Sequence, residues 1–135
     1  MIVVDTNVIG YLFLDSPRFK QVEKVVAADS QWAAPLLWRS EFRNVLAVYI
    51  RKEILSVAEA VSIMTEAVVL LKGNEYEVSS KQVLRLVTES TCSAYDCEFV
   101  ALARSLGVPL VTVDAKILKE FPTVAFAPEE YIKRT

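Results

Sequence analysis

The sequence predicts an α/β domain organised around a mainly parallel β-sheet. Short apolar runs alternate along the chain with segments whose apolar residues recur at helical spacing. Two of these runs, Ile2–Val4 and Leu110–Val113, are apolar at nearly every position and are each followed directly by an aspartate. Such runs are typical of strands buried on both faces, as in parallel sheets. A chain of 135 residues is long enough for one core, so we expect residues 1–135 to form a single domain.

Capping residues place the elements of the first half. Thr6 and Asn7 are good N-cap residues after the first strand, and Ser16 followed by Pro17 predicts a second helix start. Gly73 ends the last helix of this half. The expected elements are a strand at 2–4, helices at 7–14 and 17–28, a strand at 31–34, and helices at 35–52 and 56–71.

The predicted helix at 35–52 is apolar around most of its circumference. Such a helix is buried on more than one side, by its own core or by a second chain. We therefore expect this helix to contribute to a partner surface, through Leu36, Trp38, Phe42 and Tyr49.

In the second half, Ser79 and Ser80 cap a helix, and Gly107 with Pro109 just beyond it ends another. The expected elements are a strand at 76–78, a helix carrying Val83, Leu86 and Val87, a helix at 91–106, a strand at 110–113, a short helix at 115–120 and a strand at 124–126. No internal repeat or linker interrupts this alternation.

Composition excludes several kinds of chemistry. The chain has no histidine, which removes Ser-His-Asp and Cys-His catalysis and His-ligated zinc. With Lys+Arg 15 and Asp+Glu 17, the net charge of −2 does not by itself indicate nucleic-acid binding. Carboxylates are the groups that remain in quantity for catalysis.

No targeting or membrane segment is expected. The first strand begins at Ile2, which leaves no room for a signal peptide, and Glu59 and Glu66 interrupt the most apolar long segment. The spacing of Cys92 and Cys97 suits neither a zinc site nor an evident disulfide. We expect buried free thiols in a cytoplasmic protein.

Four acidic residues occupy positions that suggest one shared pocket. Asp5 and Asp114 each follow a buried strand, and Asp96 lies on the apolar side of its helix. Each of these aspartates also has a simpler interpretation as a helix cap, worth about 1 kcal/mol. Glu41 lies in mid-helix between Leu37 and Val45, where capping does not apply, and its alternative is a salt bridge to a nearby arginine such as Arg39 or Arg43.

Carboxylates gathered in one pocket repel one another, and protonation or a hard cation relieves the repulsion. Ligands that are all oxygen suit Mg²⁺, with Mn²⁺ as a plausible substitute. Such an ion activates water and neutralises charge on a phosphate. The residues therefore indicate a metal-dependent enzyme acting on phosphoesters, without naming its substrate.

An ordered set of motifs resembles the PIN domain, and in particular the VapC-type toxins of bacterial and archaeal toxin–antitoxin pairs. The motifs span nearly the whole chain. They are IVVDTN at the start, E-x-x-N at Glu41 and Asn44, S-x-Y-D-x-x-F-V-A-L-A from Ser93 to Ala103, and LVTVD ending at Asp114.

The resemblance implies an active site made by Asp5, Glu41, Asp96 and Asp114. Asp5 and Asp96 would be the principal Mg²⁺ ligands, and Glu41 and Asp114 would complete the metal environment and orient the attacking water. The groups expected to support these acids are Thr6, Asn7, Ser93 and Thr112. One departure is that Lys116, Ile117 and Leu118 stand where some relatives carry a further acid or asparagine, which puts a second metal site in doubt.

The resemblance also implies a three-layer α/β/α fold with a five-stranded sheet, a homodimer and a small inhibitory antitoxin. The implied reaction is endonucleolytic RNA hydrolysis, in which a metal-activated water attacks phosphorus and leaves a 5′-phosphate and a 3′-hydroxyl. Basic residues near the motifs could hold phosphates, although solvated surface charge is the simpler interpretation; these are Arg39, Arg43, Arg104 and Lys116.

Two alternatives come from other functional classes. A receiver-like signalling domain also places acids at strand ends, but it would carry an acidic pair after the first strand, where this chain has only Asp5. The other alternative is a PIN-like binding module without nuclease activity, and the presence of all four acids argues against it.

Overall fold

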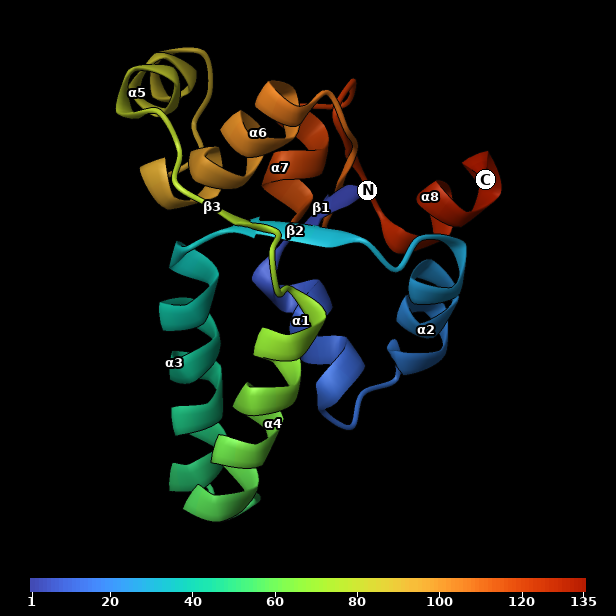
Figure 1. Cartoon of the computed structure of the whole chain (residues 1–135). Coiled ribbons are helices and arrows are strands. Elements are labelled where there is room, and N and C mark those ends of the chain that lie inside the picture. Colours follow the sequence, from blue (N-terminus) through green and yellow to red (C-terminus); the bar gives the residue numbers. More distant parts are fainter.

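The computed structural model describes residues 1–135 and has a parallel sheet between two layers of helices (Figure 1). The five strands lie in the order β3-β2-β1-β4-β5, and every neighbouring pair is parallel. This arrangement confirms the predicted α/β class and the five-stranded sheet. The strands are β1 (Ile2–Val4), β2 (Trp32–Pro35), β3 (Glu75–Tyr76), β4 (Leu110–Val111) and β5 (Ala125–Phe126).

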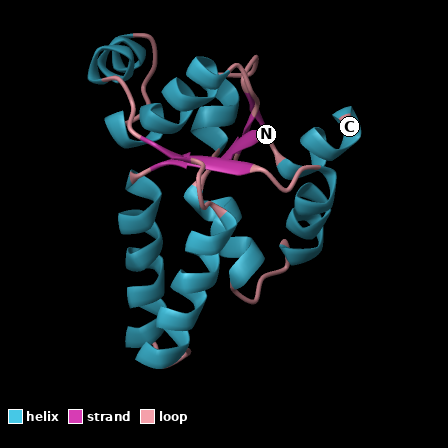
Figure 2. Ribbon diagram, in the orientation of Figure 1, coloured by secondary structure: helices cyan, strands magenta, loops and turns pink.

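Helices cover both faces of this sheet (Figure 2). One face carries α1 (Thr6–Phe13), α2 (Phe19–Ala28), α3 (Leu37–Arg51) and α4 (Val57–Leu70). The other face carries α5 (Ser80–Thr88), α6 (Ala94–Leu106) and α7 (Ala115–Glu120). The last helix, α8 (Pro128–Arg134), packs beside α2. No helix has the length and apolar character needed to cross a membrane.

The strand register aligns the carboxyl ends of the three central strands. Val3 of β1 lies opposite Ala33 of β2 on one side and Leu110 of β4 on the other. The chain proceeds from β1 towards β3 and then crosses back to β4, so the strand order reverses between β1 and β4. Ligands of open α/β sheets bind outside the carboxyl ends of the strands at such a reversal. Asp5 follows β1 at this position.

The expectation that α3 presents Trp38 and Phe42 to a partner is wrong. Both side chains are fully buried, and the Trp38 Nε1–H donates to Glu75 Oε2 at 2.8 Å. The helix is apolar around its circumference because it packs against α1, α4 and β2 at once. The large apolar residues that are exposed here are Leu36, just before the helix, at 46%, and Val48 on the helix itself, at 39%.

Two prolines act differently from their predicted roles. Pro35 ends β2 instead of opening α3, and the next amide, Leu36 N–H, donates to the Tyr76 carbonyl of β3. Pro17 lies in a turn ahead of α2, whose N-cap is Arg18. Helix α8 was not expected, although Pro128 at its first position followed by two glutamates is a recognisable helix start.

Both cysteines are free and buried, as expected. Ser93 is the N-cap of α6, so Cys92 immediately precedes the cap and Cys97 occupies the fourth helical position. Apolar side chains at these two positions pack as a hydrophobic staple that fixes how the chain enters the helix. The first turn of α6 carries Asp96, so this local packing also positions an acid.

Candidate active site

Asp5 connects β1, α1 and β4 through its two carboxylate oxygens. Oδ1 accepts the Thr6 N–H at 2.8 Å, which makes Asp5 itself the N-cap of α1. Oδ2 accepts the Thr112 hydroxyl at 2.7 Å and lies 3.5 Å from Asn7 Nδ2. The side chain is only 8% exposed. The capping interpretation of Asp5 therefore accounts for one oxygen, and the other is bonded across the point where the strand order reverses.

Thr112 links two of the four acids. Its fully buried hydroxyl donates to Asp5 and accepts the Asp114 N–H at 3.0 Å. Asp114 in turn caps α7, with Oδ1 accepting the Ile117 N–H at 2.9 Å. The Thr112 hydroxyl, just after β4, therefore holds the Asp5 carboxylate and the Asp114 backbone close to each other.

Glu41 reaches the same region from α3. It is half-buried, and its Oε1 accepts the Thr6 hydroxyl at 2.7 Å. The salt-bridge interpretation of Glu41 is wrong, because Arg39 pairs with Glu75 at 2.6 Å and the Arg43 guanidinium contacts Ser40. The carboxylate is left with a hydroxyl partner and no cation.

Asp96 lies in the first turn of α6, where its backbone N–H donates to Ser93 Oγ at 3.1 Å. That bond confirms Ser93 as the helix cap. The Asp96 carboxylate is half-buried and accepts no hydrogen bond from the rest of the fold beyond the local contact with Ser93.

The charges of the four acids act on one another, although they come from separate elements. Burial raises the pKa of Asp5 from 3.8 to about 6, and repulsion from Glu41 and Asp96 adds to it. Burial and repulsion from Asp96 raise the pKa of Glu41, while burial and repulsion from Asp114 raise that of Asp96. The fold thus concentrates negative charge at the carboxyl edge of β1 and β4.

A fifth acid, Glu98, was not expected at this site. It is half-buried on α6, burial raises its pKa, and its charge contributes to the raised pKa of Glu41. Positions i and i+2 of a helix point to different sides, so the spacing of Glu98 from Asp96 does not indicate that the two residues share a site. Only the packing of α6 against the sheet brings Glu98 next to α3.

Among the basic residues considered as phosphate contacts, Lys116 alone lies close enough for its charge to lower the pKa of an acid of the site, Asp96. Arg39 is paired with Glu75, and Arg104 lies between Glu89 and the Phe121 ring. These pairings remove the two arginines from the immediate neighbourhood of the acids.

The residues at this edge fit a hard divalent cation by their chemistry. Their donors are all oxygen, their carboxylates repel one another, and the buried Asn7 Oδ1 has no hydrogen-bond partner. As the side chains stand, no group of three or more His, Cys, Asp or Glu residues is arranged to hold a metal ion. Thr6 and Thr112 instead hold one oxygen each of Glu41 and Asp5.

Comparisons with known proteins agree with this architecture. The family model for the PIN domain matches residues 2–124. Ribonuclease VapC3 of Pyrobaculum aerophilum is 28% identical over 126 residues, covering 91% of this chain and 96% of that protein.

Two solved structures share the fold. The crystal structure of PAE2754 from Pyrobaculum aerophilum superposes with a TM-score of 0.77 at 23% identity, covering 98% of this chain and 94% of that one. A toxin–antitoxin complex from Klebsiella pneumoniae gives a TM-score of 0.69 at 18% identity, covering 95% of this chain and 98% of its counterpart. With a family match over nearly its whole length and a sheet order that brings the motif acids to one edge, this chain belongs to the PIN domain family.

Proposed function

We propose that this chain is a Mg²⁺-dependent endoribonuclease and the toxin of a toxin–antitoxin pair. The observation that carries the proposal is the proximity of three acids from three elements, Asp5, Glu41 and Asp96, at the carboxyl edge of the sheet. Thr6 bonds to both Asp5 and Glu41, and repulsion from Glu41 and Asp96 adds to the raised pKa of Asp5. Membership of the PIN family and the similarity to a protein called Ribonuclease VapC3 support RNA as the substrate.

In this proposal Asp5 and Asp96 would hold the ion, with Glu41 and Asp114 beside it. When bound, Mg²⁺ would make a water acidic enough to attack at neutral pH and would neutralise charge on the phosphate. Glu41, with its raised pKa, accepts a proton from the attacking water. The water oxygen bonds to phosphorus, the bond to the 3′ oxygen breaks, and that oxygen takes a proton from solvent water to leave as a hydroxyl. Thr6 and Thr112 keep the two carboxylates oriented.

Protein partners are also proposed, namely an antitoxin and a second copy of the chain. Support comes from the fold shared with a toxin–antitoxin complex and from exposed apolar side chains on α4. Val57 and Val61 border a hollow of about 200 Å³ between α3 and α4, whose walls are almost entirely apolar. Exposed apolar surfaces of this kind are typical of association sites.

The test is RNA cleavage by purified protein with Asp96→Asn as the decisive variant. We expect Mg²⁺-dependent cleavage by the wild type, no cleavage in EDTA, and a loss of roughly 100-fold or more in the variant, because even the loss of a group that only supports a metal ligand typically costs about 10- to 100-fold. Asp15→Asn makes the same chemical change at an exposed position and should keep full activity.

Cleavage that survives Asp96→Asn, or that continues in EDTA, would contradict the proposal. A wild type that binds RNA without cutting it in Mg²⁺ or Mn²⁺ would instead favour the binding-module alternative.

A further inference from the structure

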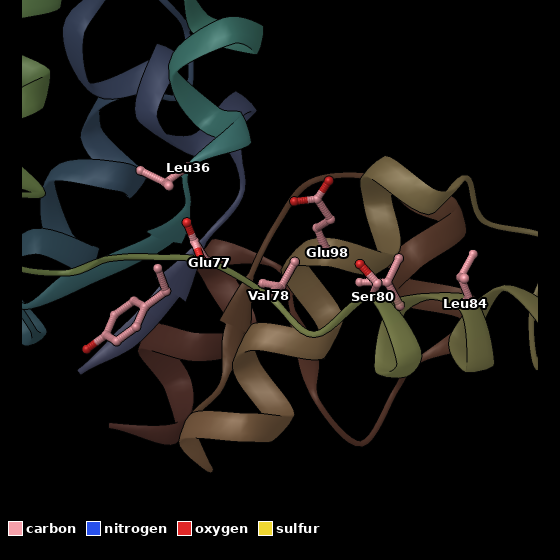
Figure 3. A pocket seen from close by; sticks show the side chains of 8 residues that line it. Leu36, Glu77, Val78, Ser80, Leu84 and Glu98 are labelled. Carbon is pink, nitrogen blue, oxygen red and sulfur yellow. The ribbon is translucent and has the colours of Figure 1, made fainter.

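A groove of about 420 Å³ opens at the carboxyl ends of β2 and β3, between the start of α3, the start of α5 and the side of α6 (Figure 3). Its walls are mainly apolar, and two carboxylates enter it, Glu77 from the segment after β3 and Glu98 from α6. The apolar side chains that matter here are Leu36, Tyr76, Val78 and Leu84. Leu36 and Leu84 are 46% and 61% exposed, so the groove is open to solvent.

The two carboxylates have no partner within the chain. Arg39, the cation closest in sequence to Leu36, is bound to Glu75, and the remaining ion pairs of the molecule involve neither Glu77 nor Glu98. No side-chain or backbone donor bonds to Glu98. An ionised carboxylate only accepts hydrogen bonds, so these two groups favour a ligand that offers donors.

The groove adjoins the acidic site. Its wall includes Leu36, directly before the helix that carries Glu41, and Glu98, two residues beyond Asp96 on α6, so a ligand in the groove would lie next to whatever the acids hold. The two carboxylates disfavour phosphate in the groove itself, because like charges repel. A neutral, flat group attached to a phosphate bound at the acids satisfies both conditions, and an unpaired nucleobase is such a group.

We propose that this groove binds one unpaired guanine next to the cleaved bond of the RNA, with Glu98 accepting its N1–H and N2–H donors. The inference rests on the proposed ribonuclease function and adds a specificity-determining residue to it. Guanine alone among the four bases presents two adjacent donors to one carboxylate. Adenine and cytosine each offer one amino group beside an acceptor, and uracil offers one N–H between two carbonyls. The Tyr76 ring and the apolar walls supply contacts for the face of the base.

The experiment uses short single-stranded RNAs that are identical except for the base at each position flanking the cleaved bond. At one position, guanine should raise kcat/KM roughly ten- to hundred-fold over uracil, as expected for one bidentate base contact. Glu98→Gln should remove the advantage of guanine at that position and favour adenine and cytosine relative to it, because an amide offers one acceptor and one donor, which match the amino group and the neighbouring ring nitrogen of either base. Glu66→Gln, the same change at an exposed position of α4, should keep the guanine preference.

Several results would overturn the inference. If Glu98→Gln lowers cleavage equally for all four bases, the residue acts on the acids and not on a base. If Leu84→Asp converts a dimer into monomers in sedimentation while the base preference stays, a second copy covers the groove. A base profile unchanged by Glu98→Gln also rejects the guanine contact, provided that thermal melting shows the variant to be folded.

Binding separates this inference from the proposed function. The anisotropy of labelled RNAs with the inactive Asp5→Asn variant should depend on guanine, and should lose that dependence when Glu98→Gln is added. Guanine-dependent binding by a wild type that cuts no RNA would reject the ribonuclease and keep the groove assignment. Cleavage without any guanine dependence would keep the ribonuclease and reject the groove assignment. A protein that neither cleaves nor binds RNA would contradict both.

Discussion

A carboxylate buried at the end of a central strand destabilises the folded protein unless its charge is compensated, and Asp5 illustrates how far the chain itself provides that compensation. A backbone N–H and the Thr112 hydroxyl both bond to it and favour the ionised form, yet its pKa remains about 6 because burial outweighs them. A ligand that brings positive charge would remove this remaining cost of the buried carboxylate, and this removal would favour its binding.

The first prediction concerns the pH dependence that Asp5 imposes on stability. Asp5 holds its proton more tightly when folded, with a pKa of about 6 against 3.8. Its contribution to the free energy of unfolding is therefore fully present below about pH 4 and is lost as pH rises through 6, on the order of 3 kcal/mol in total. In EDTA, Asp5→Asn should abolish this dependence and stabilise the protein at pH 7.5 by roughly 1 to 3 kcal/mol.

Urea unfolding at pH 4, 5, 6 and 7.5 measures this effect, with Asp15→Asn as the control because Asp15 is exposed. If Asp5→Asn is less stable than the wild type at pH 7.5, the hydrogen bonds to Asp5 already compensate for its buried charge.

The second prediction concerns the Thr112 hydroxyl. Thr112→Val keeps the shape but removes the donor to Asp5 and the acceptor for the Asp114 N–H. We expect a loss of about 1–3 kcal/mol of stability, because two buried polar groups lose a partner. Without that hydroxyl the pKa of Asp5 should rise further, so the activity of the variant should reach its plateau at a higher pH.

Thr112→Ser retains the hydroxyl and should restore the wild-type pH profile. A pH profile that is the same in the valine and wild-type proteins would mean that Thr112 serves packing alone.

Individual residues were predictable from the sequence where local rules decide their position. Asp5, Asp96 and Asp114 were identified by strand ends and helix starts, and those rules depend on neighbours in the chain. The partner of Glu41 was not predictable, because Thr6 lies 35 residues away and reaches it only through the packing of α1 against α3. Glu98 was missed for the same reason.

At the scale of elements, the first turns of α3 combine two functions. Trp38 and Phe42 are fully buried in the core, and other groups of the same turns connect the helix to β3 and to the acids. Arg39 and Trp38 both donate to Glu75 of β3, and Glu41 lies between Thr6 and the neighbouring acids. The sequence showed how apolar α3 is but not what covers it, because core and interface side chains have the same composition.

The third prediction concerns the connection between α3 and β3. The hydrogen bonds from Arg39 lower the pKa of Glu75 below its ordinary 4.5, and the bond from Trp38 adds to this. The stabilisation is therefore present above about pH 4.5 and is lost as pH falls below it, which is the opposite sign to the contribution of Asp5.

Glu75→Gln should reduce stability at pH 7 by roughly 1 kcal/mol, a modest figure because Arg39 is partly exposed. The deficit relative to wild type should shrink towards pH 3 in thermal melts. A deficit that is constant with pH would indicate lost packing and not a lost charge contact.

At the scale of the whole molecule, Asp5 and Asp114 come together only because of the strand order. β1 and β4 are separated by more than 100 residues, yet they are neighbours, and the hydrogen bond from Thr112 to Asp5 crosses between them. The alternation of strands and helices predicted a parallel sheet, and parallel strands bring their carboxyl ends to one edge. That reasoning places Asp5 and Asp114 at the same edge, but it does not give the order of strands, which depends on how helices of both layers pack.

The last prediction applies to the folded molecule as a ligand-binding unit. An ion that binds only the folded state stabilises it by mass action, by about 2.7 kcal/mol at a hundred-fold excess over its Kd. For a domain of this size that corresponds to a rise in Tm of roughly 10 °C. In EDTA, Asp5→Asn should have a higher Tm than the wild type. In saturating Mn²⁺ the Tm of the wild type should rise and that of the variant should rise little. The difference between the two Tm values should therefore narrow or change sign. Parallel gains in both proteins would place the ion away from Asp5, and no gain in the wild type would contradict a metal site at this edge.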